Sequence, residues 1–268
     1  MLIVTLGDLL LDVIVRLEET LATGADANAA TRTGPGGQAA NVAAWAVALG
    51  AEARCVARRG EDPAGVWLAA DVAARGVELV GPVSGRNGVV VSLVSPEGER
   101  TMASDRGTAT ALAPDDLDPA WFACDCLHIS GYSLLAAPID AAATRAAELA
   151  RDNGAQVSVD LSAWTRIRAH GVDRFREQLA ALAPDIVFGN EREWDELGAL
   201  GETRVVKRGP DGFDVVRGTD VDRCQAPNVS VVDTTGAGDA LAAGYLVGGP
   251  ELALEAAARC VTQVGAMP

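Results

Sequence analysis

A carboxylate stands inside a glycine-rich segment near the carboxyl end of the chain. The segment Asp233-Thr234-Thr235-Gly236-Ala237-Gly238-Asp239-Ala240 leads into a run of small apolar residues with helical character. Gly236, Ala237 and Gly238 carry almost no side chain, so an anion can approach the backbone amides at the positive end of the helix dipole. Asp239 would repel that anion unless its carboxylate accepts a proton from a hydroxyl as a phosphoryl group arrives. The segment therefore predicts phosphoryl transfer.

A second glycine cluster, Gly34-Pro35-Gly36-Gly37-Gln38-Ala39-Ala40-Asn41, also opens an expected helix. Glycine permits positive φ and lets a ligand come close to the backbone. Asn41 falls about one turn into the helix, where its amide can both donate to and accept from a hydroxyl. Taken alone, this cluster is better explained as a structural turn. The glycine order differs from Gly-x-Gly-x-x-Gly and from the P-loop pattern, which argues against both of these nucleotide-binding motifs.

The elements that must position these residues alternate between strand-like and helix-like patterns. We expect strands at residues 2–6 (continued by 13–15), 53–57, 127–129, 157–159, 186–188 and 204–206, with a further β-like run at 228–232. We expect helices at 39–49, 63–76, 139–151, 173–182, 191–197 and from 240 onward. Such alternation predicts βαβ units and an α/β fold, in which helices cover both faces of a mainly parallel sheet.

Two regions interrupt the alternation. Residues 20–33 are rich in small and polar residues without a firm period, and residues 87–104 read as a β-hairpin with its turn at Pro96-Glu97-Gly98-Glu99. We expect a single domain over 1–268, with lid segments at about 13–34 and 87–105 that form a small β lid over the carboxyl edge of the sheet. A solvated surface hairpin is the alternative.

Bulk composition narrows the class of protein. The 268 residues are 49% hydrophobic with a formal net charge of −15, which argues against nucleic acid or an anionic membrane as partner. No window approaches twenty uncharged apolar residues and no basic leader is present, so we expect neither a membrane span nor a signal peptide. The five cysteines have no framework spacing, which favours a reduced, cytoplasmic protein. The only lysine, Lys207, is read as compositional bias.

Together, the two glycine clusters resemble the signatures of the ribokinase-like (PfkB) carbohydrate kinases. The segment 36–41 resembles the N-terminal signature, and 233–239 resembles the C-terminal signature nearly letter for letter. Residues 7–12, Asn190-Glu191-Arg192-Glu193 and the segment 207–212 resemble three further family motifs in the same order. The resemblance spans the whole chain. It implies a three-layer α/β/α (ribokinase-like) fold with a mainly parallel central sheet and a small β lid.

The resemblance implies a role for each matched position. Asp239 becomes the catalytic base, and the amides of Gly236, Ala237 and Gly238 stabilise charge on the transferred group. The sugar-binding residues become Asp12, Gly36, Gly37 and Asn41. Asp8 competes with Asp12, but only Asp12 has the family spacing.

The remaining matched positions lie on the nucleotide and metal side. The nucleotide-binding residues become Asn190, Lys207, Gly209 and Gly212, although most relatives have a threonine in place of the lysine. Glu193 would reach Mg²⁺, through water, because magnesium keeps several waters and needs few carboxylates. Asp233 and Thr235 would offer oxygens to K⁺.

The expected function is that of an ATP-dependent sugar kinase, which transfers the γ-phosphoryl group of ATP to a hydroxyl, typically a primary alcohol, of a small carbohydrate. The cofactors implied are ATP and Mg²⁺, with K⁺ at the C-terminal signature, and a homodimer is expected through the lid. Ribose, a ketohexose, a keto-acid sugar and a nucleoside all stay open as acceptors. The arginines near the expected acceptor site are Arg100, Arg106, Arg166 and Arg168. No additional basic pocket is evident, which disfavours a phosphosugar.

Other functional classes also stay open. A nucleoside kinase of the same family is one alternative. A catalytically silent sugar-binding protein on this scaffold is another, because Asp160-Leu161-Ser162 departs from the Asp-x-Asn pattern common after that strand. An unrelated dinucleotide-dependent α/β enzyme is the third.

Overall fold

The apolar run at the start of the chain forms β1, in the interior of a mostly parallel sheet. A computed structural model describes residues 1–97 and 99–268. Within these residues, nine strands form one sheet in the order β13 (Asp220–Cys224), β12 (Phe213–Arg217), β11 (Thr203–Lys207), β10 (Ile186–Asn190), β9 (Gln156–Asp160), β8 (Cys126–Ser130), β1 (Leu2–Leu6), β4 (Glu52–Val56) and β5 (Glu78–Val80). The strands from β11 to β5 are parallel, and β12 and β13 add an antiparallel edge. The inner strands are apolar runs because helices cover both faces.

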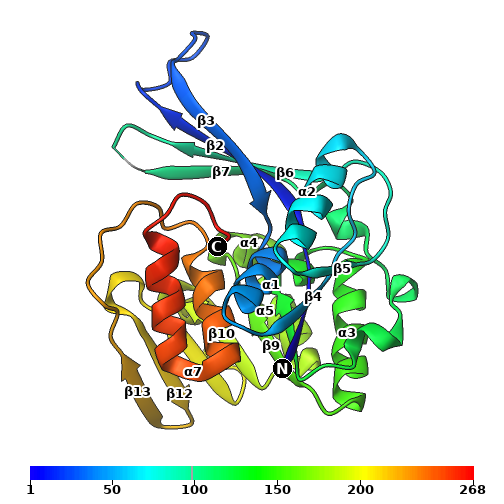
Figure 1. The fold of residues 1–268 in the computed structure, drawn as a ribbon. Coiled ribbons are helices and arrows are strands. Elements are labelled where there is room, and N and C mark those ends of the chain that lie inside the picture. The colour runs from blue at the N-terminus through cyan, green and yellow to red at the C-terminus, as the bar shows by residue number, and fades with distance from the viewer. Residues whose placement is uncertain (98) are drawn as a thin grey trace.

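Two sets of helices enclose this sheet (Figure 1). One core cluster contains side chains of α1 (Gln38–Ala48), α2 (Pro63–Ala74) and α7 (Ala237–Val261). The other contains side chains of α3 (Ile139–Asp152), α4 (Trp164–His170), α5 (Val172–Leu182) and α6 (Glu191–Leu197). Short 3-10 turns complete the elements: η1 (Gly107–Ala111), η2 (Pro114–Asp116), η3 (Pro119–Phe122), η4 (Gly131–Leu135) and η5 (Gly209–Asp211). The expected three-layer α/β/α architecture is confirmed.

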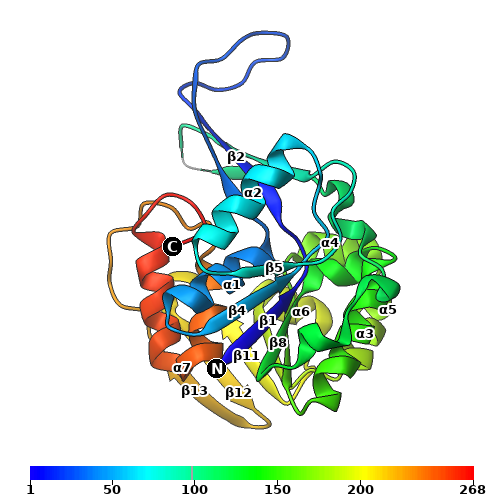
Figure 2. The ribbon, with the colours of Figure 1, turned by 45° about the vertical axis from the view of Figure 1, so that its right-hand side comes forward.

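A second, smaller sheet projects from the edge at which β1 ends (Figures 1 and 2). Its strands lie in the order β3 (Ala29–Gly36), β2 (Leu10–Leu17), β6 (Gly88–Val94) and β7 (Arg100–Asp105). We call this four-stranded sheet the lid. Only three residues separate β1 from β2, so the chain passes directly from the carboxyl edge of the central sheet into the lid.

Several local predictions are confirmed, and others are wrong. Strands β8 to β11 and helices α3, α5 and α6 lie within two residues of their expected bounds. Residues 13–15 do not continue the first strand, because β2 pairs with β3 and β6 in the lid. Strands β3, β5, β12 and β13 and helix α4 were not predicted. The predicted turn of the β6–β7 hairpin includes Gly98, which lies outside the described residues.

The β-like run at 228–232 is a loop and not a strand. Val231 and Val232 are 60% and 49% exposed. Their β-branched side chains gave a strand pattern, but no neighbouring strand pairs with this segment in the described part of the chain. The loop instead passes beside α7, where it bounds a cavity described below.

Helix α7 changes direction at Gly248 and Gly249, and Pro250 begins its second arm. A Cβ atom at Gly244 would come within 2.5 Å of Leu252 O, so the two arms pack closely. The first arm begins at the C-terminal signature and the second arm returns toward it. Among the described residues, no helix is both long and apolar enough to cross a membrane.

Candidate active site

The two glycine clusters meet where α1 and α7 begin. Asn41 Nδ2 donates to Asp239 Oδ2 at 2.7 Å, across 198 positions of sequence. Asn41 is 5% exposed, and its Oδ1 atom is buried without a hydrogen-bond partner in the described structure. The structure therefore joins the two residues that were predicted separately, and it leaves an acceptor beside the carboxylate.

The C-terminal signature forms a loop that turns into α7. Gly236 has φ +79, and a Cβ atom there would lie 2.6 Å from Ala266 Cα, so only glycine is accommodated. Among the residues that the structure describes, no side chain caps this helix, and first-turn amides have no acceptor within their own helix. Ala237 N–H makes one long bond, 3.3 Å, to Thr234 O. The loop therefore offers backbone donors to an anion in front of the helix.

The carboxylate at this helix start titrates near neutrality. Burial, and then the charge of the nearby Asp160 carboxylate, raise the pKa of Asp239 from 3.8 to about 7, against the opposing effects of the Asn41 hydrogen bond and Lys207. A base with a pKa near the working pH combines the ionised state with useful basicity. Asp239 can therefore accept a proton at ordinary pH.

The lid brings a second acidic group to the same end of the sheet. A Cβ atom at Gly36 would lie 2.2 Å from Asp12 Oδ2, so this glycine makes room for the Asp12 carboxylate across the β2–β3 pair. Burial, and then the charge of Asp8, raise the pKa of Asp12 to about 7. Asp8 is buried and pairs with Arg106, whose guanidinium lies 3.7 Å from the ring centroid of Tyr132.

The four arginines expected near the acceptor divide into two groups. Arg100 donates to Thr235 Oγ1 and thereby connects β7 of the lid to the C-terminal signature. Arg106 reaches Asp8 from the segment after β7. Arg166 is exposed on α4, and Arg168 pairs with Glu196 of α6. Arg100 and Arg106 therefore lie at the site, whereas Arg168 is paired with Glu196 away from it.

A cavity of about 700 Å³ lies on the other side of the C-terminal signature. Lys207, Gly209 and Gly212 line it together with Ala237 and Gly238. Its apolar walls come from the 226–231 loop and the second arm of α7: Val229, Val231, Leu254, Ala257, Ala258 and Val261. Sequence reasoning missed these wall residues. Their signal is the helical spacing of Leu254, Ala257, Ala258 and Val261 in the final apolar stretch.

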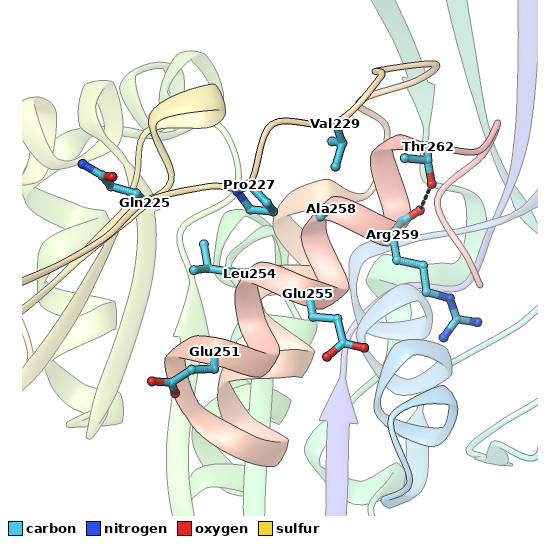
Figure 3. A pocket seen from close by; sticks show the side chains of 9 residues that line it. All are labelled: Gln225, Pro227, Val229, Glu251, Leu254, Glu255, Ala258, Arg259 and Thr262. Carbon is cyan, nitrogen blue, oxygen red and sulfur yellow. Dashed lines mark hydrogen bonds between the residues drawn. The ribbon is translucent and has the colours of Figure 1, made fainter.

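A second, open depression of about 620 Å³ lies against the outer side of the same helix arm. Figure 3 shows Pro227 and Val229 of the loop beside Leu254 and Ala258 of α7, with Glu251 and Glu255 further down the helix. Pro227, Val229, Leu254 and Ala258 also line the larger cavity, so the two hollows adjoin each other. Of these two hollows, the larger one is lined by Gly238 and the open depression is not.

The Asn190–Glu193 pair forms the N-terminal cap of α6. Glu193 Oε2 accepts from Asn190 N, Glu193 Oε1 accepts from Asn190 Nδ2, both at 2.8 Å, and Asn190 Oδ1 accepts from Glu193 N at 3.0 Å. This is a capping box, so the pair has a structural role of its own. Glu193 is 1% exposed, and burial raises its pKa.

The carboxylates near the loop are compatible with a magnesium ion that takes most of its ligands from phosphate and water. Within the described residues, no group of three or more His, Cys, Asp or Glu side chains is arranged to hold a metal ion directly. The carboxylates of Asp160, Glu193 and Asp239 nevertheless act together on Lys207. Magnesium commonly takes one or two carboxylates and completes its shell with phosphate and water. These residues therefore suit an ion that arrives with phosphates.

Asp233 organises the loop at the expected K⁺ position. Its Oδ1 accepts from Thr235 N at 2.9 Å and Thr235 Oγ1 at 2.6 Å, and its Oδ2 accepts from Gly265 N at 3.1 Å. Burial would raise the pKa of Asp233, but these hydrogen bonds outweigh it and hold the pKa below its ordinary value. The carboxylate therefore stays charged within the loop.

Comparisons with known proteins agree with this geometry. The model of the pfkB family carbohydrate kinases matches residues 1–267. An ATP-dependent ribose-1-phosphate kinase of Halopiger xanaduensis is 33% identical over 248 residues, which cover 85% of this chain and 79% of that protein. A fructokinase of Klebsiella pneumoniae is 31% identical over 240 residues, or 80% and 76%.

Solved structures share the whole fold. Adenosine kinase from Sinorhizobium meliloti has a TM-score of 0.89 at 25% identity, covering 99% of this chain and 95% of that one. A sugar kinase from Pyrococcus horikoshii in complex with ATP has a TM-score of 0.85 at 23% identity, covering 99% and 95%.

The fold, the anion loop and the carboxylate at a helix start define a phosphotransferase with an alcohol group as acceptor. The chain belongs to the pfkB family of carbohydrate kinases and is a sugar or nucleoside kinase.

Proposed function

We propose that this enzyme transfers the γ-phosphoryl group of ATP to a primary alcohol of a small carbohydrate, with Asp239 as the general base. The observation that supports this most is the hydrogen bond between Asn41 and Asp239, because it joins an amide that can bind a hydroxyl to a carboxylate at the start of the anion loop's helix. Asp239 accepts the proton of the substrate hydroxyl, whose own pKa is far too high for unaided attack. A positioned carboxylate contributes about 10²–10⁴-fold to such a step.

The other residues of the site orient and stabilise. The unpaired Asn41 Oδ1 can accept from a sugar hydroxyl, while Asp12 accepts from others at the lid side. Gly36 and Gly37 leave the backbone open beside Asp12. The amides of the 236–238 loop donate to the transferred phosphoryl group as charge develops on it.

ATP with Mg²⁺ is the proposed phosphoryl donor. The apolar walls of the 700 Å³ cavity suit a flat heterocycle, and Gly209, Gly212 and Lys207 lie on the path from those walls to the anion loop. The fold shared with the ATP-bound sugar kinase supports the same placement. Magnesium supplies charge neutralisation on the phosphates when bound, and Asn190 and Glu193 would hold its water shell.

A potassium ion at the C-terminal signature belongs to the same proposal. Asp233 stays ionised and Thr235 lies against it, so the loop presents a negative group beside the anion site. A cation there would reinforce the anion loop. The proposal predicts faster turnover in K⁺ than in the same concentration of tetramethylammonium, with equal rates as the contrary result.

The preferred acceptor in this proposal is a free sugar, and a nucleoside is the alternative. Arg106 is engaged by Asp8 and Arg100 by Thr235, so the arginines at the site are already paired with protein groups. A nucleoside acceptor is supported by the likeness to adenosine kinase, and a phosphosugar by the likeness to the ribose-1-phosphate kinase. All three therefore belong in the panel of acceptors.

Assembly and location complete the proposal. β7 is an edge strand of the lid and is exposed along its whole length, so a second lid can pair with it in a homodimer. A monomeric mass by light scattering at working concentration would contradict this. The five cysteines lie in the described part of the chain and are free thiols, which supports a cytoplasmic location.

The deciding experiment is a coupled ADP-release assay with MgATP and K⁺ across free sugars, keto-acid sugars, nucleosides and ribose 1-phosphate. Asp239→Asn runs beside the wild type, with the exposed Asp220→Asn as the matched control. We expect one acceptor class to give turnover that falls by at least about 10²-fold in Asp239→Asn and not in the control. Undiminished turnover in Asp239→Asn would refute the proposed base.

A further inference from the structure

The single lysine of the chain, Lys207, lies at the carboxyl edge of the central sheet. Of the 22 lysines and arginines, only Lys207 is a lysine. It is the last residue of β11 and lies opposite Asn190 in the parallel register, so it stands at the carboxyl edge of the sheet beside the α6 cap. The interpretation of this lysine as compositional bias does not account for that placement.

A buried carboxylate fixes the position of the lysine ammonium group. Lys207 Nζ lies 2.9 Å from Asp160 Oδ1 and 2.7 Å from Asp160 Oδ2, and Asp160 ends the neighbouring strand β9. The Asp160 side chain is fully buried, whereas that of Lys207 is 17% exposed. The pair is therefore covered on the Asp160 side and open on the Lys207 side.

The open side faces the anion loop. A Cβ atom at Gly238 would lie 3.2 Å from Lys207 Nζ, so the ammonium group stands directly against the backbone of the loop. Lys207 and Gly238 line the same cavity. Since an ammonium group has three donors and Asp160 takes up to two of them, a donor remains for a ligand in front of Gly238.

The surrounding charges keep this lysine protonated. Burial alone would lower the pKa of Lys207, but the carboxylates of Asp160 and Glu193, with Asp239 beyond them, outweigh burial and raise it. These three carboxylates and one ammonium group leave the pocket with a local charge of −2 when all are ionised (three negative, one positive). An incoming phosphate therefore meets one fixed cation among several anions.

We propose that Lys207 donates a hydrogen bond to the terminal phosphoryl group of bound ATP and keeps it through transfer, with Asp160 as the residue that positions the lysine. This inference rests on the proposed function. In the transfer, the acceptor oxygen forms a bond to phosphorus as the bond from phosphorus to the bridging oxygen breaks. ADP leaves with that electron pair, and the acceptor proton goes to Asp239. Lys207 neither gains nor loses a proton.

Lysine suits this position better than arginine. The compact ammonium group fits between a carboxylate at under 3 Å and the Gly238 backbone, where a planar guanidinium would be wider. A competing explanation of the pair is that Lys207 only neutralises Asp160. A buried charge left without its partner is strongly destabilising, so this role alone could account for the lysine. The two explanations differ in whether the lysine recognises the terminal phosphate.

Isothermal titration calorimetry with nucleotides separates the two explanations of Lys207. The wild type, Lys207→Met, Lys207→Arg and the double variant Lys207→Met/Asp160→Asn are each titrated with MgATP and with MgADP. The double variant leaves no unpaired buried charge, so it stays informative if the single variant folds poorly. We expect ATP affinity to fall by about 10–100-fold and ADP affinity by less than roughly threefold in the methionine variants, as for a hydrogen bond to a charged group. Equal losses for ATP and ADP would overturn the proposal.

Two further readouts use the same proteins. Protein labelled with ¹⁵N at the lysine side chain has one ammonium resonance, which should shift on addition of MgATP and much less on addition of MgADP. With an active acceptor, Lys207→Met should lower kcat more than it raises the KM for the acceptor. If the wild type binds neither nucleotide, the proposed function fails and this inference fails with it. If the wild type binds ATP and Lys207→Met keeps its discrimination between ATP and ADP, only the inference fails.

Discussion

Asn41 and Asp239 are joined by a 2.7 Å hydrogen bond between the start of α1 and the start of α7. Each residue follows its own glycine cluster, and α1 and α7 pack on the same face of the central sheet. The bond holds the carboxylate in place and lowers its pKa against the effect of burial. The two signatures therefore lie at one site.

The first prediction concerns pH. Asp239 must be ionised to act as a base and its pKa is about 7, so kcat/KM should fall by about tenfold per pH unit as pH drops below that value. The groups that act on it besides Asn41 are Asp160 and Asp8, which raise the pKa, and Lys207, which lowers it.

Asn41→Ala tests whether the fall of kcat/KM at low pH, the acid limb of the profile, reports Asp239. The variant removes a bond that lowers the pKa of Asp239, so the acid limb of the kcat/KM profile should move to higher pH. Asn153→Ala, at the exposed end of α3, serves as the control and should leave the profile in place. An unmoved limb in Asn41→Ala would assign the titration to another group.

The second prediction concerns stability. The folded pKa of Asp239 lies above its unfolded value of 3.8, so below about pH 4 the group is protonated in both states and has no effect. As pH rises toward about 7, the unfolded chain releases this proton first, and the free energy of unfolding decreases. Asp239→Asn should therefore be more stable than the wild type at pH 8, by a few kcal/mol at most. Urea unfolding at about pH 4 and pH 8 measures this, and an equal difference at both values would contradict it.

The third prediction concerns the apolar cavity. Ala257 lines the cavity that reaches Gly238, whereas Glu255 lines only the outer depression. Ala257→Phe should raise the Kd for ATP by roughly tenfold or more, because a ring would occupy the space proposed for adenine. Glu255→Phe, two positions away on the same helix, should change that Kd little. A larger effect in Glu255→Phe would place the nucleotide in the depression of Figure 3.

The fourth prediction concerns the N-terminal glycine cluster. Gly37 has φ +100, and a Cβ atom there would lie 2.4 Å from Asp8 O, whereas Gly50 has φ +94 with open space around it. Both Gly37→Ala and Gly50→Ala incur backbone strain, but only Gly37→Ala adds a backbone clash. Gly37→Ala should be less stable than Gly50→Ala by about 2 kcal/mol or more in thermal or urea unfolding. Equal losses would show that the contact with Asp8 relaxes freely.

Elements with strong periodicity and residues with unusual chemistry could be predicted from the sequence alone. Strands β8 to β11 are short apolar runs bounded by helices, so their type follows from pattern alone. Asp239 stood out because a carboxylate at a helix start opposes the helix dipole. The spacing of Asn190 and Glu193 is also visible in the sequence, whereas their reciprocal hydrogen bonds are seen only in the structure.

Which of these residues lie close together could be seen only in the folded chain. Strand β3 is weakly patterned and forms because β2 and the lid offer it a partner, while residues 228–232 have a strand pattern and form none because no neighbouring strand pairs with them in the described structure. Asp160 and Lys207 end strands β9 and β11, which lie on either side of β10, so parallel register brings them together at one edge. Side-chain pattern reports local burial, whereas pairing and proximity depend on chain segments far away in sequence.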